Sequence, residues 1–143
     1  MKINKPTFWD KKKPNFLTYI LSPLTFLLKL NNIILKLIPK KKFDQIKSIC
    51  VGNIYLGGTG KTPTSLKLYQ LLKAKNYNVV IGKKYYSSQK DEIILLKNKS
   101  DFISSKNREE IIGLATKKNH ELIIFDDGLQ DRKIDYDIKF VCF

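Results

Sequence analysis

At 143 residues and 43% hydrophobic composition, the chain is long enough to bury the core of one modest domain. Its two cysteines lie in apolar runs without motif spacing, which excludes a disulfide framework and is typical of structural thiols in a reducing compartment. A single histidine, His120, excludes a histidine-rich metal cluster, while the net charge of +14 indicates an anionic partner or a well-solvated surface.

The positive charge is concentrated in residues 1–47, where eleven lysines against two aspartates give a net +9. Within this segment, residues 16–38 are mostly apolar and are bracketed by two lysine triplets. Pro23 is expected to break or kink a helix there, and the leucines and isoleucines after it leave a broad apolar face opposite lysines. This pattern predicts residues 1–44 as a basic arm whose helix lies on an anionic membrane surface.

Two other interpretations of the apolar segment are less favoured, and a third stays open. Lysines and asparagines interrupt the run, which argues against a transmembrane helix, and no small-residue cleavage site follows as a signal peptide requires. A helix packed on the domain's own core is the open alternative. We expect no nucleic acid partner, because the lysines flank an apolar stretch and are not interleaved with stacking aromatics.

After the arm, short apolar runs alternate with stretches of helical periodicity. Strands are predicted at residues 46–53, 77–82, 101–105, 121–127 and 136–143, and helices at 61–76 and 107–119. Such alternation is typical of βαβ units, so residues 45–143 are predicted to form an α/β domain with a mainly parallel sheet and flanking helices. The chain stops inside the last run, which predicts an edge strand or a continuation.

The stretch YLGGTGKTP joins the first predicted strand to the first helix of this domain. In a phosphate loop, glycines turn successive backbone N–H groups inwards, Lys61 reaches the outer phosphates, and Thr62 offers a hydroxyl to Mg²⁺. The usual spacing has glycine where this chain has Tyr55, and the double glycine before Thr59 can make the turn instead. A glycine turn that merely caps a helix is the ordinary alternative. The residues predicted to bind nucleotide are Tyr55, Leu56, Gly57, Gly58, Thr59, Gly60, Lys61 and Thr62.

The stretch LIIFDDG places Asp126 and Asp127 at the C-terminal end of a buried strand, where open α/β sheets bind ligands. An acid at this position can hold Mg²⁺ beside the phosphates, directly or through water. A strand-ending turn is the ordinary alternative for an Asp-Asp-Gly sequence. Because the pair follows the phosphate loop in the usual order, we predict that these aspartates contribute to a magnesium site.

Taken together, VGNIYLGGTGKTP, the Asp-Glu pair at residues 91–92 and IIFDDGLQDRKIDYDI resemble the tetraacyldisaccharide 4′-kinases, the lipid A 4′-kinase family. The resemblance implies a P-loop NTPase-like fold and an enzyme of lipid A biosynthesis. Such an enzyme uses ATP and Mg²⁺ to phosphorylate the 4′-hydroxyl of a tetraacylated glucosamine disaccharide 1-phosphate. It implies a lipid substrate and a peripheral location on the cytoplasmic face of the bacterial inner membrane.

By position, the resemblance implies that Asp91 is the base that activates the sugar hydroxyl, with Lys61 as the second catalytic residue. A carboxylate near the γ-phosphate can accept the proton of the attacking hydroxyl. The other interpretation of Asp91 is an acid at the start of a helix. The resemblance also implies that Thr62, Asp126 and Asp127 hold the Mg²⁺ ion.

The chain departs from the family pattern at several positions, among them Lys90 and Ile93 in place of a glycine and a proline, and in its length. KKYY, residues 83–86, replaces Ser-Arg-Gly-Tyr, so Lys84 stands where an arginine fork is usual. Asp131 replaces a histidine after Gln130, and family members are longer, with a second domain and a further catalytic histidine. We therefore expect the N-terminal part of such a kinase, which binds ATP without appreciable transfer by itself. The competing interpretation is a non-catalytic, membrane-tethered nucleotide-binding module.

Overall fold

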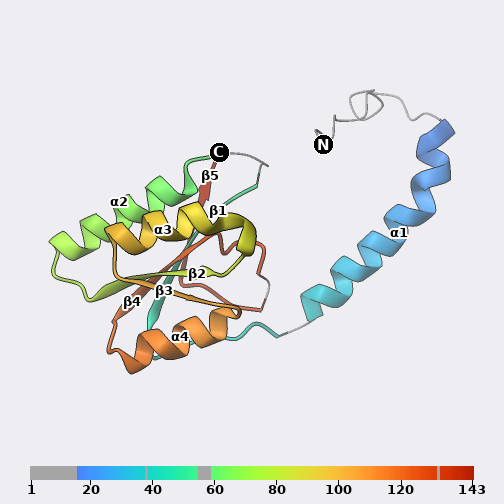
Figure 1. The fold of residues 1–143 in the computed structure, drawn as a ribbon. Coiled ribbons are helices and arrows are strands. Elements are labelled where there is room, and N and C mark those ends of the chain that lie inside the picture. Colours follow the sequence, from blue (N-terminus) through green and yellow to red (C-terminus); the bar gives the residue numbers. More distant parts are fainter. Residues whose placement is uncertain (1–15, 38, 55–58, 132) are drawn as a thin grey trace. The chain divides into compact units, whose positions relative to one another are not determined.

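The computed structural model describes residues 16–37, 39–54, 59–131 and 133–143, and the chain divides into two units after Pro39. The first unit contains one long helix, α1 (Phe16–Leu37), and the second contains a sheet with its helices (Figure 1).

Helix α1 continues through Pro23, so of the break or kink predicted at this residue the break is wrong. A proline removes only one backbone donor, and the hydroxyl of Thr25 adds a side-chain bond to the carbonyl of Ser22 at 2.7 Å in the same turn. None of the described helices is long and apolar enough to cross a membrane. The large apolar side chains exposed on α1 include Leu24, Phe26, Leu27, Leu28, Leu30, Ile33 and Ile34.

The second unit is built on a five-stranded sheet in the order β3-β2-β4-β1-β5, in which every pair of neighbours is parallel. Its strands are β1 (Lys47–Asn53), β2 (Val79–Lys84), β3 (Phe102–Ser105), β4 (Leu122–Asp126) and β5 (Ile138–Cys142). All five predicted strands are confirmed, with ends that differ from the predicted ones by no more than two residues. The parallel arrangement brings the carboxyl ends of all strands to one edge of the sheet.

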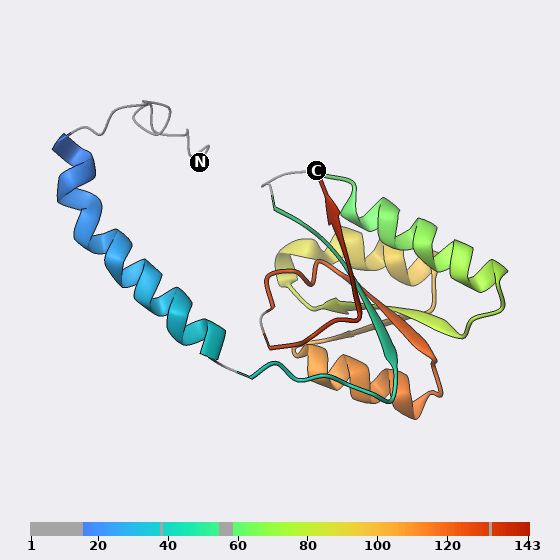
Figure 2. The ribbon, with the colours of Figure 1, turned by 180° about the vertical axis from the view of Figure 1, so that it is seen from behind.

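Helices cover both faces of this sheet. They are α2 (Lys61–Ala74), α3 (Lys90–Lys99) and α4 (Arg108–Lys117), and a single 3₁₀ turn, η2 (Ser87–Gln89), precedes α3. Figures 1 and 2 show α2 and α3 on one face and α4 on the other. Two of these helices were predicted. The third, α3, was anticipated only as a helix start at Asp91, because its apolar residues form one short run without helical spacing.

The core consists of two clusters because successive strand residues point to opposite faces. On β4, Ile124 packs in the cluster that includes Leu66 of α2 and Leu96 of α3. Its neighbours Ile123 and Phe125 pack in the cluster beneath α4. The sheet is thereby held from both sides, and the ends of β1, β2 and β4 are fixed relative to the start of α2.

Candidate functional site

The predicted phosphate loop and the predicted acids lie at the same edge of the sheet. Strands β1 and β4 pair directly, with Val51 opposite Asp126, and α2 begins at Lys61, shortly after β1. The N-terminus of α2, with its partial positive charge, therefore opens beside the end of β4. Four residues of the predicted loop, 55–58, lie outside the described residues, so the roles of Tyr55, Leu56, Gly57 and Gly58 stay predictions.

The loop enters α2 through Gly60, whose φ of 76° lies in the left-handed region. A Cβ atom at this position would meet no heavy atom within 4 Å, so glycine is needed here for its backbone angle and not for space. The Gly60 carbonyl accepts hydrogen bonds from the backbone N–H and the hydroxyl of Thr64, at 3.0 and 2.9 Å. The buried hydroxyl of Thr59 finds no hydrogen-bond partner in the described part of the chain. A phosphate oxygen at the helix N-terminus would supply one.

Lys61 is the charged group at the start of α2. Its Nζ donates to Oδ1 of Asn53 at 2.9 Å and to Oδ1 of Asp127 at 3.1 Å. Asp127 has a φ of 65°, uncommon for a residue with a side chain, and its backbone N–H is bonded to the Val51 carbonyl at 2.8 Å. This turn directs the Asp127 carboxylate to the lysine, so the ammonium is held at the start of α2 by partners from the ends of β1 and β4.

Asp126 lies at the centre of the site, with no exposed surface. Its Oδ1 accepts a hydrogen bond from the Ser65 hydroxyl at 2.8 Å, and its Oδ2 accepts one from the Thr62 hydroxyl at 3.2 Å. Oδ2 also accepts from Nζ of Lys83 at 2.6 Å. The sequence-predicted pair of Thr62 and Asp126 thus comes together, and both carboxylate oxygens already have partners from α2 and β2.

Lys83 comes from the end of β2, and only 1% of its side chain is exposed. Besides Asp126, it donates to Oε2 of Glu92 at 2.5 Å, so it lies between two carboxylates. Burial by itself would lower the pKa of Lys83, but the charge and hydrogen bond of Asp126, together with Glu92, outweigh it and raise that pKa. The side chain is therefore an ammonium at neutral pH.

Asp91, the predicted base, lies in the first turn of α3 and is exposed. Its position suits an acid at a helix start, which the positive end of the helix dipole favours. The adjacent Glu92 is the residue of this pair that bonds to Lys83 and so connects α3 with Asp126. The structure thus places Asp91 next to a residue in contact with the site.

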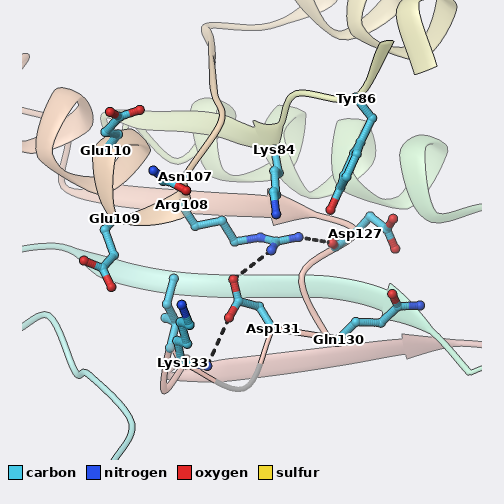
Figure 3. Close-up of a pocket in the computed structure, with 11 residues that line it drawn as sticks. Lys84, Tyr86, Asn107, Arg108, Glu109, Glu110, Asp127, Gln130, Asp131 and Lys133 are labelled. Carbon is cyan, nitrogen blue, oxygen red and sulfur yellow. Dashed lines mark hydrogen bonds and ion pairs between the residues drawn. The ribbon is translucent and has the colours of Figure 1, made fainter. Parts of the chain in front are cut away.

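A pocket of about 590 Å³ is lined in part by Asp127, whose carboxylate also bonds to Lys61. It is lined by Lys84, Tyr86, Asn107, Arg108, Glu109, Glu110, Asp127, Gln130, Asp131, Lys133 and Ile134. Figure 3 shows the side chains of Lys84 and Tyr86 extending toward Arg108 and Asp127. Arg108 is almost fully buried and donates to Asp131 Oδ2 at 2.8 Å and to the Asp127 carbonyl at 2.5 Å.

Asp131 keeps its negative charge in this pocket. Burial by itself would raise the pKa of Asp131, but the backbone N–H of Lys133 and the guanidinium of Arg108 lower it. Arg108 therefore connects the start of α4 with the turn after β4. It bonds to the carbonyl of Asp127, and the carboxylate of Asp127 bonds to Lys61.

Sequence reasoning assigned no role in this site to several of its residues: Asn53, Ser65, Lys83, Arg108 and Asp131. Ser65 was within reach of prediction, because it follows Thr62 by three residues and shares its helix face. Lys83 carried a weaker signal, a lysine at the end of a strand that is otherwise apolar. Arg108 carried none, since its partners lie 19 and 23 residues away in the chain.

The donor set at Thr62 and Asp126 fits Mg²⁺. A hydroxyl and a carboxylate 3.2 Å apart are the hard oxygen ligands that this ion prefers. The described residues contain no group of three or more histidines, cysteines or acids that could hold a metal ion alone. Magnesium usually takes one or two protein oxygens and completes its shell with phosphates and water, so the site suits an ion that binds together with a nucleotide.

Residues 17–143 match the family model described as tetraacyldisaccharide-1-P 4′-kinase. The tetraacyldisaccharide 4′-kinase of Pelagibacter ubique is 45% identical over 145 residues, which cover 100% of this chain. The protein of the same name from Rickettsia akari is 33% identical over 147 residues and 92% of this chain. In both cases the match covers 45% of the relative's own length.

Among solved structures, the fold is similar to that of LpxK from Aquifex aeolicus in complex with ATP. The TM-score is 0.70 at 26% sequence identity, and the match covers 88% of this chain and 49% of the other. This similarity confirms the predicted P-loop NTPase-like α/β fold.

Proposed function

Because the chain belongs to the tetraacyldisaccharide-1-P 4′-kinase family, as the resemblance of its motifs predicted, we propose that residues 40–143 form the ATP-binding part of such a kinase. The phosphate acceptor is the 4′-hydroxyl of a tetraacyldisaccharide 1-phosphate. One observation carries the proposal: the first two residues of α2, Lys61 and Thr62, bond to the last acid of β4 and the acid that follows it. The related Aquifex aeolicus structure, in complex with ATP, supports ATP as the nucleotide.

In this proposal, each described residue has a defined role. Lys61 exchanges the Asp127 carboxylate for the outer phosphates of ATP, whose negative charge its ammonium neutralises. Thr62 and Asp126, with Asp127 beside them, hold Mg²⁺, which when bound neutralises charge on the β- and γ-phosphates. Asp91 accepts the proton of the attacking hydroxyl. The residues of the loop, from Tyr55 to Gly60, surround the phosphates.

The pocket beside Asp127 is the site that we propose for the sugar of the acceptor. It has the size of a small-molecule site and shares Asp127 with the nucleotide site. Its lining mixes lysines, acids and amides, which can bond to sugar hydroxyls as donors and as acceptors.

A chimera tests the proposed reaction, because the chain spans 45% of the length of its Pelagibacter ubique relative. Residues 1–143 replace the matching region of that relative, and the assay follows radiolabelled γ-phosphate from ATP to a tetraacyldisaccharide 1-phosphate in detergent micelles. We expect transfer by the chimera and its loss on Asp91→Ala, because the acceptor hydroxyl then lacks its base. ATP binding without transfer, while the unaltered relative is active, would instead support the non-catalytic module.

We further propose that the N-terminal arm binds an anionic membrane surface, at the cytoplasmic face of the inner membrane. The exposed leucines and isoleucines of α1 suit the acyl region, and Lys29 with the flanking lysines suits anionic head groups. A lipid substrate would then be reached from the membrane on which the enzyme lies.

Vesicle co-sedimentation tests the arm. The full chain is expected to bind phosphatidylglycerol-containing vesicles and to dissociate as salt rises, since each lysine near the surface contributes about 1 kcal/mol. Deletion of residues 1–42 should leave the protein in the supernatant, and vesicles of neutral lipid serve as the control. Equal binding of the deleted and the full chain would contradict the proposal.

A further inference from the structure

Lys83 holds the acid that the proposed function assigns to Mg²⁺. Both side chains are buried, with 1% of Lys83 and none of Asp126 exposed, and their charged atoms are 2.6 Å apart. Removing either partner from such a pair leaves a buried charge without compensation, which is strongly unfavourable. In the described structure, Lys83 therefore supplies the positive charge that Asp126 requires.

A metal ion and the Lys83 ammonium cannot both approach the same oxygen of Asp126 closely. Oδ1 is bonded to Ser65, so Oδ2 is the oxygen on the side of Thr62, and Lys83 already lies against it. Two cations on one oxygen repel each other, most strongly where water is excluded. Binding of Mg²⁺ at Thr62 and Asp126 thus requires that Lys83 retreat.

Glu92 is a second carboxylate partner for the Lys83 ammonium. Its Oε2 is 2.5 Å from the lysine Nζ, and 47% of its side chain is exposed, so it can move with the ammonium toward solvent. Strand β2 keeps the lysine backbone fixed beside β4: Gly82 and Phe125 are paired, and Lys83 and Asp126 follow directly. Only the side chain of Lys83 has to move for the ammonium to leave Asp126 and stay with Glu92.

We propose that Lys83 is a tethered counter-ion of Asp126, which leaves this carboxylate for Glu92 when Mg²⁺ enters with the nucleotide. The inference rests on the proposed function, because it concerns the same ATP site. It assigns Lys83 a positioning role: the lysine keeps the carboxylate ordered before nucleotide binds, and it lowers the site's affinity for Mg²⁺. Because Glu92 lies in the first turn of α3, the movement of Lys83 away from Asp126 also links the metal site to the helix that carries Asp91.

Calorimetry of ATP binding to the full chain, in EDTA and over a range of Mg²⁺ concentrations, tests the exchange. In Lys83→Met, the gain in ATP affinity on adding Mg²⁺ should exceed that of the wild type by tenfold or more, since the ion no longer competes with an ammonium. The melting temperature of this variant should be low in EDTA and rise with Mg²⁺ alone, a response that the wild type lacks. Lys67→Met, at an exposed position of α2, is the matched control.

Glu92→Gln provides an independent measurement should Lys83→Met fail to fold. Because Lys83 then has no carboxylate to move to, the gain in ATP affinity on adding Mg²⁺ should fall below that of the wild type. In the double variant Lys83→Met/Glu92→Gln, that gain should equal the gain of Lys83→Met. A further loss in the double variant would mean that Glu92 binds the ion directly, and this would overturn the exchange.

The outcomes separate the inference from the proposed function. If the wild type binds no ATP with or without Mg²⁺, the proposed function fails. If it binds ATP, and the Mg²⁺ dependence is the same in the wild type, Lys83→Met and Glu92→Gln, only the exchange at Asp126 is overturned.

Discussion

Replacement of Lys61 by alanine is expected to weaken Mg·ATP binding by about 100-fold, since a hydrogen bond to a charged group contributes roughly 1.5–3 kcal/mol. The lysine is the charged side chain at the start of α2, and its Nζ is held by Asn53 and Asp127 where the outer phosphates would lie. Its side chain is 21% exposed, so the substitution creates no large cavity in the core. Isothermal calorimetry with ATP measures the affinity.

Lys67→Ala is the matched control for this prediction, because it removes the same charge from an exposed position of the same helix. Its ATP affinity should stay within about twofold of the wild type, as expected for a distant solvated lysine. Circular dichroism should show both variants folded. Equal ATP affinity of Lys61→Ala and the wild type would contradict the assignment of residues 55–62 as a phosphate loop.

The second large effect is expected on stability. Asp126→Asn should lower the free energy of unfolding by about 2–3 kcal/mol, less than the roughly 3–5 kcal/mol for a buried charge left without a partner, because Glu92 still neutralises Lys83. The amide keeps the shape of the side chain, but it leaves the Lys83 ammonium buried with only Glu92 as a counter-ion. Urea unfolding of the full chain, followed by far-UV circular dichroism, gives the difference.

Asp101→Asn is the control, because Asp101 forms an ion pair with Lys73 at 2.8 Å in which both side chains are substantially exposed. It should cost about 1 kcal/mol or less. A double variant, Lys83→Met/Asp126→Leu, should recover much of the stability lost in Asp126→Asn, since an apolar pair of similar volume removes both buried charges. A loss of less than about 1 kcal/mol for Asp126→Asn would show that Lys83 does not depend on this carboxylate.

The resemblance to the kinase family and the fold of residues 40–143 were within reach of the sequence because their signals are local. A buried parallel strand is read from one short apolar run, and helix α2 from the spacing of Leu66, Leu68, Tyr69 and Leu72. The end of β4 was visible in the same way, because two acids follow a run of apolar residues. Where the local signal was ambiguous, the prediction was less complete: the helix does not break at Pro23, and the extent of α3 was not predicted.

The start of α2 was likewise within reach of the sequence, since the left-handed turn at Gly60 and the lysine after it are properties of neighbouring residues. Only the tertiary structure decided what surrounds Asp126. Lys83 and Ser65 lie 43 and 61 residues from it in the chain, and no local pattern indicates that a lysine is buried. The order of the strands places β2 beside β4, and this pairing turns a lysine at a strand end into the counter-ion of the central acid.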